Sequence, residues 1–102
     1  MIERYVFIKL NDEHATAGGR DEVAAMAERV LPRLPGVVSV RIATPADAHA
    51  AGAWDLSLAV DFATVADADA YRAHPDHRRF VDEFLAPRLA VIKAWNMALC
   101  YM

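Results

Sequence analysis

The chain has 102 residues, 56% of them apolar, and a formal net charge of −3. This length predicts one domain, and the apolar content is sufficient for a hydrophobic core, which excludes a disordered chain. The densest basic tract is Arg78-Arg79, so the clustered positive charge that nucleic acid binding needs is missing. The first ten residues are too charged for a signal sequence, and no apolar run is long enough to span a membrane. The single cysteine, Cys100, excludes an internal disulfide, and we expect a cytoplasmic protein with no nucleic acid or membrane partner.

The first half of the chain predicts strand, helix and strand in turn. Residues 3–10 (ERYVFIKL) are rich in aromatic and β-branched side chains, which predicts a strand. Apolar residues at helical spacing predict a helix over residues 20–34 with one buried face, ended by Pro35-Gly36. Residues 37–44 (VVSVRIAT) predict a second strand, and the small residues at 45–53 predict a loop.

The second half predicts a strand, two short helices and a final strand. Residues 54–62 (WDLSLAVDF) alternate between apolar and mixed positions, as a half-buried strand does. Thr64 is expected to cap a helix that runs to Ala73, and Pro75 should interrupt it before a second helix over 76–85. Residues 91–101 predict the last strand. The order β-α-β-β-α-β is that of the ferredoxin-like α+β fold, a four-stranded antiparallel sheet with both helices on one face.

The alternation of side chains predicts which face of the sheet the helices cover. Trp54, Leu56 and Leu58 should face the helices, whereas Tyr5 and Phe7 should lie on the other face. Aromatic side chains on an uncovered sheet face predict a partner. A second copy packed sheet to sheet would close a homodimeric barrel.

The segment YRAHPDHRRF (71–80) holds a candidate catalytic pair, Tyr71 and His77. On an unbroken helix the two side chains would point about 120° apart, so they need a kink to reach one cavity, and Pro75 supplies it. Histidine can exchange a proton near neutral pH, and a tyrosine hydroxyl can stabilise a developing enolate oxygen. The alternative is that Tyr71 is a core aromatic residue and His77 a packed helix residue.

Two further polar positions, His74 and Arg4, have simpler interpretations. His74 is expected at the helix break, where its ring can bind free backbone groups. His74 and His77 form an HxxH motif, but zinc needs a third protein ligand, so no metal is expected. Arg4 shares a strand face with Val6 and Ile8, so it must pair with a carboxylate such as Asp82 or Glu83, reach solvent, or bind an acidic ligand.

Four segments together resemble the stress-responsive α/β-barrel (Dabb, dimeric α/β-barrel) family: YVFIKLNDE, LPGVVSVRI, WDLSLAVDF and YRAHPDHRRFV. The resemblance covers nearly the whole chain as one Dabb-like domain, residues 1–102, and implies a ferredoxin-like monomer that forms a homodimer through its sheets. Plant members of this kind are polyketide cyclases that use no metal or cofactor, and their working pair falls on His77 and Tyr71. Two further cyclase pocket histidines fall on Arg4 and Leu56, which argues against an identical substrate.

Three functions therefore compete. The first is a homodimer that binds a small organic ligand in a cavity between sheet and helices. The second is a cofactor-independent cyclase, isomerase, lyase or monooxygenase with His77 as general base and Tyr71 as oxyanion donor. The third is a stress-protective oligomer without a site. The expected ligand-binding residues are Arg4, Leu56, His74 and Phe80.

Overall fold

The computed structural model describes residues 1–101 and contains one four-stranded antiparallel sheet. The strand order is β2-β3-β1-β4, which places β1 and β3 in the middle. The order, with helices packed on one face, confirms the predicted ferredoxin-like α+β fold. The strands are β1 (Ile2–Leu10), β2 (Val37–Ala43), β3 (Leu56–Phe62) and β4 (Leu89–Ala98).

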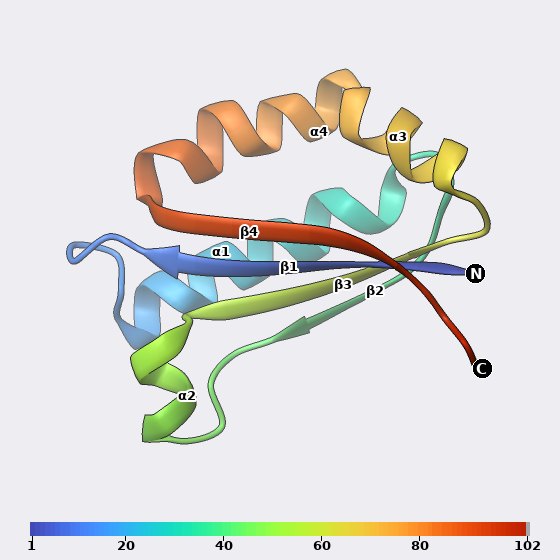
Figure 1. Cartoon of the computed structure of the whole chain (residues 1–102). Helices are drawn as coiled ribbons and strands as arrows, with labels where there is room; N and C mark the ends of the chain where they lie inside the picture. Colours follow the sequence, from blue (N-terminus) through green and yellow to red (C-terminus); the bar gives the residue numbers. More distant parts are fainter. Residues whose placement is uncertain (102) are drawn as a thin grey trace.

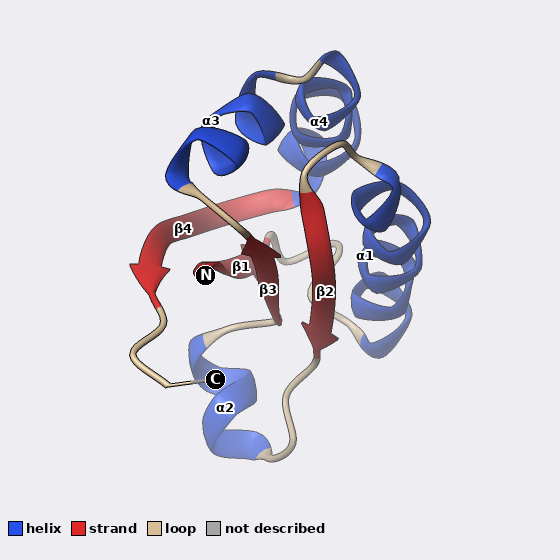
Figure 2. Cartoon of the chain, turned by 90° about the vertical axis from the view of Figure 1, so that its right-hand side faces the viewer, coloured by secondary structure: helices blue, strands red, loops and turns tan. Residues whose placement is uncertain are grey.

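Three helices lie on one face of the sheet, and a fourth short helix lies at the end of the sheet far from the N-terminus (Figures 1 and 2). The helices on the face are α1 (Ala17–Val30), α3 (Val65–Ala73) and α4 (Pro75–Arg79), and the one at the end is α2 (Ala48–Ala53). Three short segments extend the helices: η1 (Leu31–Arg33) and η3 (Ala86–Arg88) are 3₁₀, and η2 (Phe80–Leu85) is π-helical. Within residues 1–101, no helix is long and apolar enough to cross a membrane.

The hydrophobic core fills the space between the helices and the sheet. Every second residue of β3, from Leu56 to Phe62, is buried, as the alternation predicts. Val23 and Ala27 of α1 are completely buried against this face. The apolar side chains of the strands and helices thus form one contiguous cluster.

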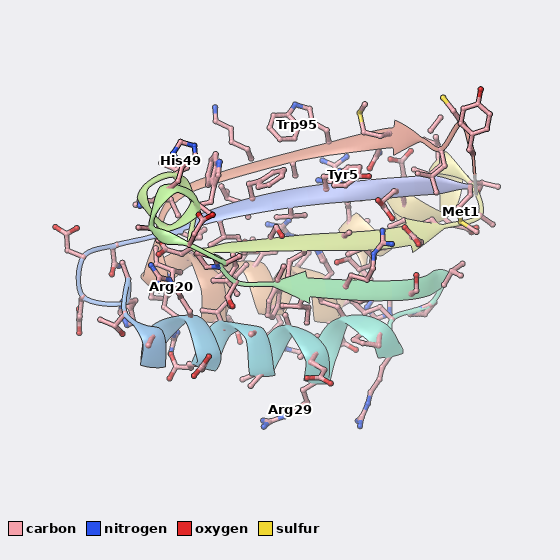
Figure 3. All side chains as sticks on the ribbon, turned by 90° about the horizontal axis from the view of Figure 1, so that it is seen from below. Met1, Tyr5, Arg20, Arg29, His49 and Trp95 are labelled. Carbon is pink, nitrogen blue, oxygen red and sulfur yellow. The ribbon has the colours of Figure 1, made fainter. Side chains whose placement is uncertain are left out.

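The opposite face of the sheet has an uncovered aromatic patch. Tyr5 and Phe7 of β1 pair in register with Trp95 and Lys93 of β4, so all four side chains leave the sheet on the same side. Figure 3 shows Tyr5 and Trp95 beside each other on this face. Trp95 keeps 50% of its surface exposed, and the Phe7 and Trp95 rings lie 6.2 Å apart. The predicted uncovered aromatic face is therefore present.

The same face becomes polar toward β2. Glu3 is 4% exposed although it lies on the uncovered side, because Arg41 of the neighbouring strand pairs with its carboxylate. Asp61 lies opposite Glu3 in the register and accepts a hydrogen bond from Ser39 at 2.9 Å. This half of the face is held together by charge rather than by apolar contact.

The segment 45–53, predicted to be a loop, contains helix α2. Asp47 caps this helix, since its carboxylate accepts the Ala50 N–H at 2.9 Å. Alanine has the highest helix propensity, and four of the six residues in α2 are alanine. The last strand also differs from its prediction, since it begins at Leu89 and ends at Ala98.

The prediction that Trp54 faces the helices was wrong. Trp54 ends helix α2, with its N–H bonded to the Ala50 carbonyl, and β3 begins only at Leu56. The Trp54 ring lies 5.7 Å from the Phe7 ring, on the uncovered side. The next residue, Asp55, falls on the mixed side of the alternation predicted for residues 54–62, but it is 1% exposed.

Candidate functional site

The break between α3 and α4 places the side chains of Tyr71 and His77 together. Helix α3 ends at Ala73 because His74, the residue before a proline, takes an extended conformation. Pro75 then begins α4 at the first helical position, where its missing N–H costs nothing. Across this break the Tyr71 and His77 rings lie 4.4 Å apart at a tilt of 48°. The proline thus starts a new helix rather than distorting one, and the two side chains meet.

The hydrogen bond of His77 sets its tautomer. Its Nδ1 lies 3.1 Å from the backbone carbonyl oxygen of Arg72. A carbonyl oxygen only accepts, so Nδ1 carries the proton and Nε2 keeps its lone pair in the neutral ring. Burial lowers the pKa of His77, the Arg72 carbonyl partly opposes this, and the charges of Arg78 and Arg4 lower it further. At neutral pH the ring is therefore uncharged, with a basic nitrogen available.

Tyr71 is the complementary donor. Its side chain is 2% exposed, and its ring also packs against Phe62 at 4.9 Å. Burial raises the pKa of the hydroxyl strongly, and the charge of Arg4 opposes this only in part. The hydroxyl therefore stays protonated and can donate a hydrogen bond to an oxygen that gains negative charge.

Arg4 brings a positive charge to this cluster. Its Nη1 donates to the side-chain oxygen of Asn96 at 3.0 Å, and Arg4 is partly buried. Burial lowers the pKa of Arg4, as does the charge of Arg72, but a guanidinium stays charged at neutral pH. Asp82, offered above as a partner, instead pairs with Arg78 at 2.6 Å. Among residues 1–101 no carboxylate forms an ion pair with Arg4.

The remaining sequence-predicted residues lie outside this cluster. His74 caps α4, since its Nδ1 accepts the Asp76 N–H at 3.1 Å. Leu56 is a core residue paired with Ile8, four residues and about 13 Å along the strand from the level of Arg4. Phe80 is buried and stacks on Phe84 at 5.8 Å.

Phe80 instead lines a groove of about 690 Å³ between α1 and the segment from α4 to η3. Arg4, Tyr71 and His77 do not line this groove. In the described part of the chain, no group of three or more His, Cys, Asp or Glu side chains is arranged to hold a metal ion.

Asn96 is the member of the cluster that sequence reasoning missed. It pairs in register with Arg4 although the two residues are 92 positions apart, and it is a polar residue on the helix-facing side of β4. A polar residue at an inward position of the last strand was the available signal. Only the register of β1 with β4 shows what it binds.

The fold, the uncovered aromatic face and the Arg4–Tyr71–His77 cluster define a small ferredoxin-like protein with a polar cluster beneath a broken helix. The family described as the Stress responsive A/B Barrel Domain (Dabb) matches residues 2–95, and the chain belongs to this family. No match was found among curated proteins.

Solved structures share the fold over nearly the whole chain. One is a Dabb family protein with a ferredoxin-like fold from Mesorhizobium loti, with a TM-score of 0.81, 20% identity, and 98% of this chain and 97% of that chain covered. A dimeric ferredoxin-like protein of unknown function from Thermobifida fusca has a TM-score of 0.81 and 26% identity, with 96% and 90% covered. A hydroxynitrile lyase from Passiflora edulis has a TM-score of 0.79 and 16% identity, with 99% and 94% covered.

Proposed function

We propose that the protein is a homodimer that binds a small organic acid at the cluster of Arg4, Tyr71 and His77. The observation that supports the ligand is Arg4, which is partly buried, donates a hydrogen bond to Asn96 and forms no ion pair with a carboxylate in residues 1–101. A buried charge needs a counter-charge, and a ligand carboxylate supplies one with two parallel hydrogen bonds. The Tyr71 hydroxyl and His77 Nε2 then bind the polar end of the same molecule.

The homodimer rests on the aromatic patch of the uncovered face. Trp95 and Met97 are each about half exposed on β4, beside Tyr5 and Phe7 of β1. An exposed apolar patch of this kind marks an interaction surface. The Thermobifida fusca protein, similar over most of its length, is described as dimeric. The Glu3–Arg41 half of the face makes the proposed interface only partly dry.

Ligand binding is tested by thermal shift across a panel of β-keto acids and phenolic acids. Binding should raise the Tm of the wild type, and the rise should vanish in Arg4→Gln and shrink in His77→Ala. Arg33→Gln, which removes an exposed positive charge on η1 away from this cluster, is the matched control and should keep the rise. A panel that shifts neither wild type nor variants would count against the site.

A second function, cofactor-independent acid-base catalysis, is favoured by the tautomer of His77. With Nδ1–H bonded to the Arg72 carbonyl, Nε2 can take a proton from the carbon next to a ketone. Tyr71 then donates a hydrogen bond to the enolate oxygen, while Arg4 holds the carboxylate of the same substrate. This arrangement suits a cyclase, isomerase or lyase step.

Proton abstraction can be measured without knowing the substrate. Levulinate, a stable keto acid, is incubated with the protein in D₂O, and deuterium entry at its α-carbons is followed by NMR. Exchange above the buffer rate should fall by about 100-fold or more in His77→Gln. Exchange that is equal in wild type and His77→Gln would limit the site to binding.

A further inference from the structure

The groove of about 690 Å³ described above, here called the α1–η2 groove, lies apart from the Arg4 cluster. Its lining combines apolar side chains with arginines. Its floor is apolar, and four arginines from four different helical elements surround it. The floor residues are Met26, Val30, Leu34, Phe80 and Phe84, and the arginines are Arg29, Arg33, Arg79 and Arg88. Its volume falls within the range of small-molecule sites, about 300–1,000 Å³.

The charge of the groove is opposite to that of the chain. The lining contains four arginines and two carboxylates, Asp76 and Glu83, whereas the whole chain carries a formal charge of −3. Arg79 is paired with Asp76 at 2.9 Å. Glu83 is the one lining carboxylate that would repel an anion, and it does not outweigh the arginines.

Arg29 and Arg33 provide the free positive charge. They are spaced i, i+4 on the continuous helical run of α1 and η1, where like charges repel each other and destabilise a helix. Neither forms an ion pair with a carboxylate among residues 1–101. Figure 3 shows Arg29 on the side of α1 that points away from the sheet. Its side chain is part of the groove lining. An anion between the two guanidinium groups would relieve the repulsion.

The other wall is fixed in place. Arg88 donates from Nε to Glu22 and from Nη1 to the Phe84 carbonyl, each at 2.7 Å, and its guanidinium lies 4.1 Å above the Phe84 ring. The wall itself is the π-helical segment η2, and π-helical turns occur frequently at functional sites. The Phe80 and Phe84 rings that this segment contributes to the floor stack on each other at 5.8 Å.

We propose that this groove binds an amphipathic organic anion, a carboxylate head with an apolar chain or ring. The head lies between Arg29 and Arg33, and the apolar body lies on Phe80, Phe84 and Met26. The complementarity is of charge at the rim and of apolar surface at the floor. This site is independent of the Arg4 cluster and would remain if that cluster proved to bind nothing.

The test is titration of the full-length protein with decanoate, followed by backbone amide NMR, with decanol as the neutral analogue. Decanoate should bind saturably and shift the amides of Met26, Val30 and Phe84, and decanol should bind at least about tenfold more weakly. The double variant Arg29→Gln/Arg33→Gln should weaken decanoate binding at least about tenfold. Arg72→Gln/Arg78→Gln, which removes the same amount of charge from α3 and α4 outside the groove lining, should change it less than twofold.

Three results would overturn the proposal. The first is equal weakening in both double variants, which would assign the effect to net charge. The second is decanol binding as tightly as decanoate. The third is binding at another place. Amide shifts confined to Tyr5 and Trp95 would place the anion at the uncovered face, and loss of binding in Arg4→Gln would place it at the Arg4 cluster.

Discussion

Asp55→Ala should be one of the most destabilising single substitutions in this chain. Asp55 is 1% exposed at the start of β3, and its carboxylate holds together three parts of the fold. One oxygen accepts the backbone N–H of Leu10 at 2.8 Å, at the end of β1. The other accepts a hydrogen bond from Nε of Arg20 in α1 at 3.0 Å and forms an ion pair with Nη2 of the same guanidinium at 2.9 Å.

The size of the loss follows from these contacts. Removing the carboxylate leaves the Leu10 N–H buried without its partner and Arg20 without its counter-charge. A hydrogen bond to a charged group contributes about 1.5–3 kcal/mol, and breaking a buried ion pair costs about 3–5 kcal/mol. The Arg20 side chain is still 23% exposed and can recover some hydration, so we expect a loss near 3 kcal/mol. That is a large part of the roughly 5–15 kcal/mol that stabilises a typical domain.

Urea unfolding at one fixed protein concentration measures the effect, because a dimer's stability depends on concentration. Asp47→Ala is the matched control, since it removes an exposed carboxylate that only caps α2 and should cost about 1 kcal/mol. In the double variant Arg20→Ala/Asp55→Ala the two losses should not add, since both remove the same ion pair. A loss below 1 kcal/mol for Asp55→Ala, or full additivity, would refute this account of the junction.

Three further predictions concern pH, assembly and a turn. Burial lowers the pKa of His77 in the folded protein, so the unfolded chain binds more protons at acidic pH. The free energy of unfolding of the wild type should therefore fall as pH drops below about 6.5, and it should fall less in His77→Gln. Urea unfolding from pH 4.5 to 7.5 measures both. Trp95→Lys should give a monomer by light scattering at low micromolar concentration, while Ile92→Lys, on the other face of the same strand, should not. Gly36→Ala should lose about 1 kcal/mol or more in the same unfolding assay, since Gly36 has φ +84° and the new Cβ would lie 3.3 Å from the side chain of Asp67.

Local patterns predicted the fold because most elements are amphipathic with one clear period. The strand over residues 3–10 and the helix over 20–34 each lie within three residues of their observed start. Helix α2 was missed because six residues give too short a window for periodicity, and its cap at Asp47 has meaning only once the helix exists. The error at Trp54 has the same origin. Trp54 continues the alternation of β3 in the sequence, but in the structure it is the C-terminal cap of α2.

The site was predictable only where its residues are close in sequence. Tyr71 and His77 lie in one short segment, and Pro75 between them predicts the helix break that brings their rings together. Asn96 and Arg4 meet through the pairing of the first and last strands, which no local pattern specifies. The α1–η2 groove depends on the packing of two helical segments and on a π-helical turn, and neither has a reliable signal in the sequence.

The charge of Arg4 links the parts of the cluster to one another. Burial is the main cause that lowers the pKa of His77, and the charge of Arg4 adds to it; burial raises the pKa of Tyr71, and the charge of Arg4 partly opposes that rise, so the hydroxyl is a stronger hydrogen-bond donor than burial alone would leave it. A histidine or leucine at position 4 would do neither at neutral pH. The same guanidinium that would bind a ligand carboxylate therefore also tunes the base and the donor beside it. Arg4 is thus the residue on which both proposed activities of the cluster depend.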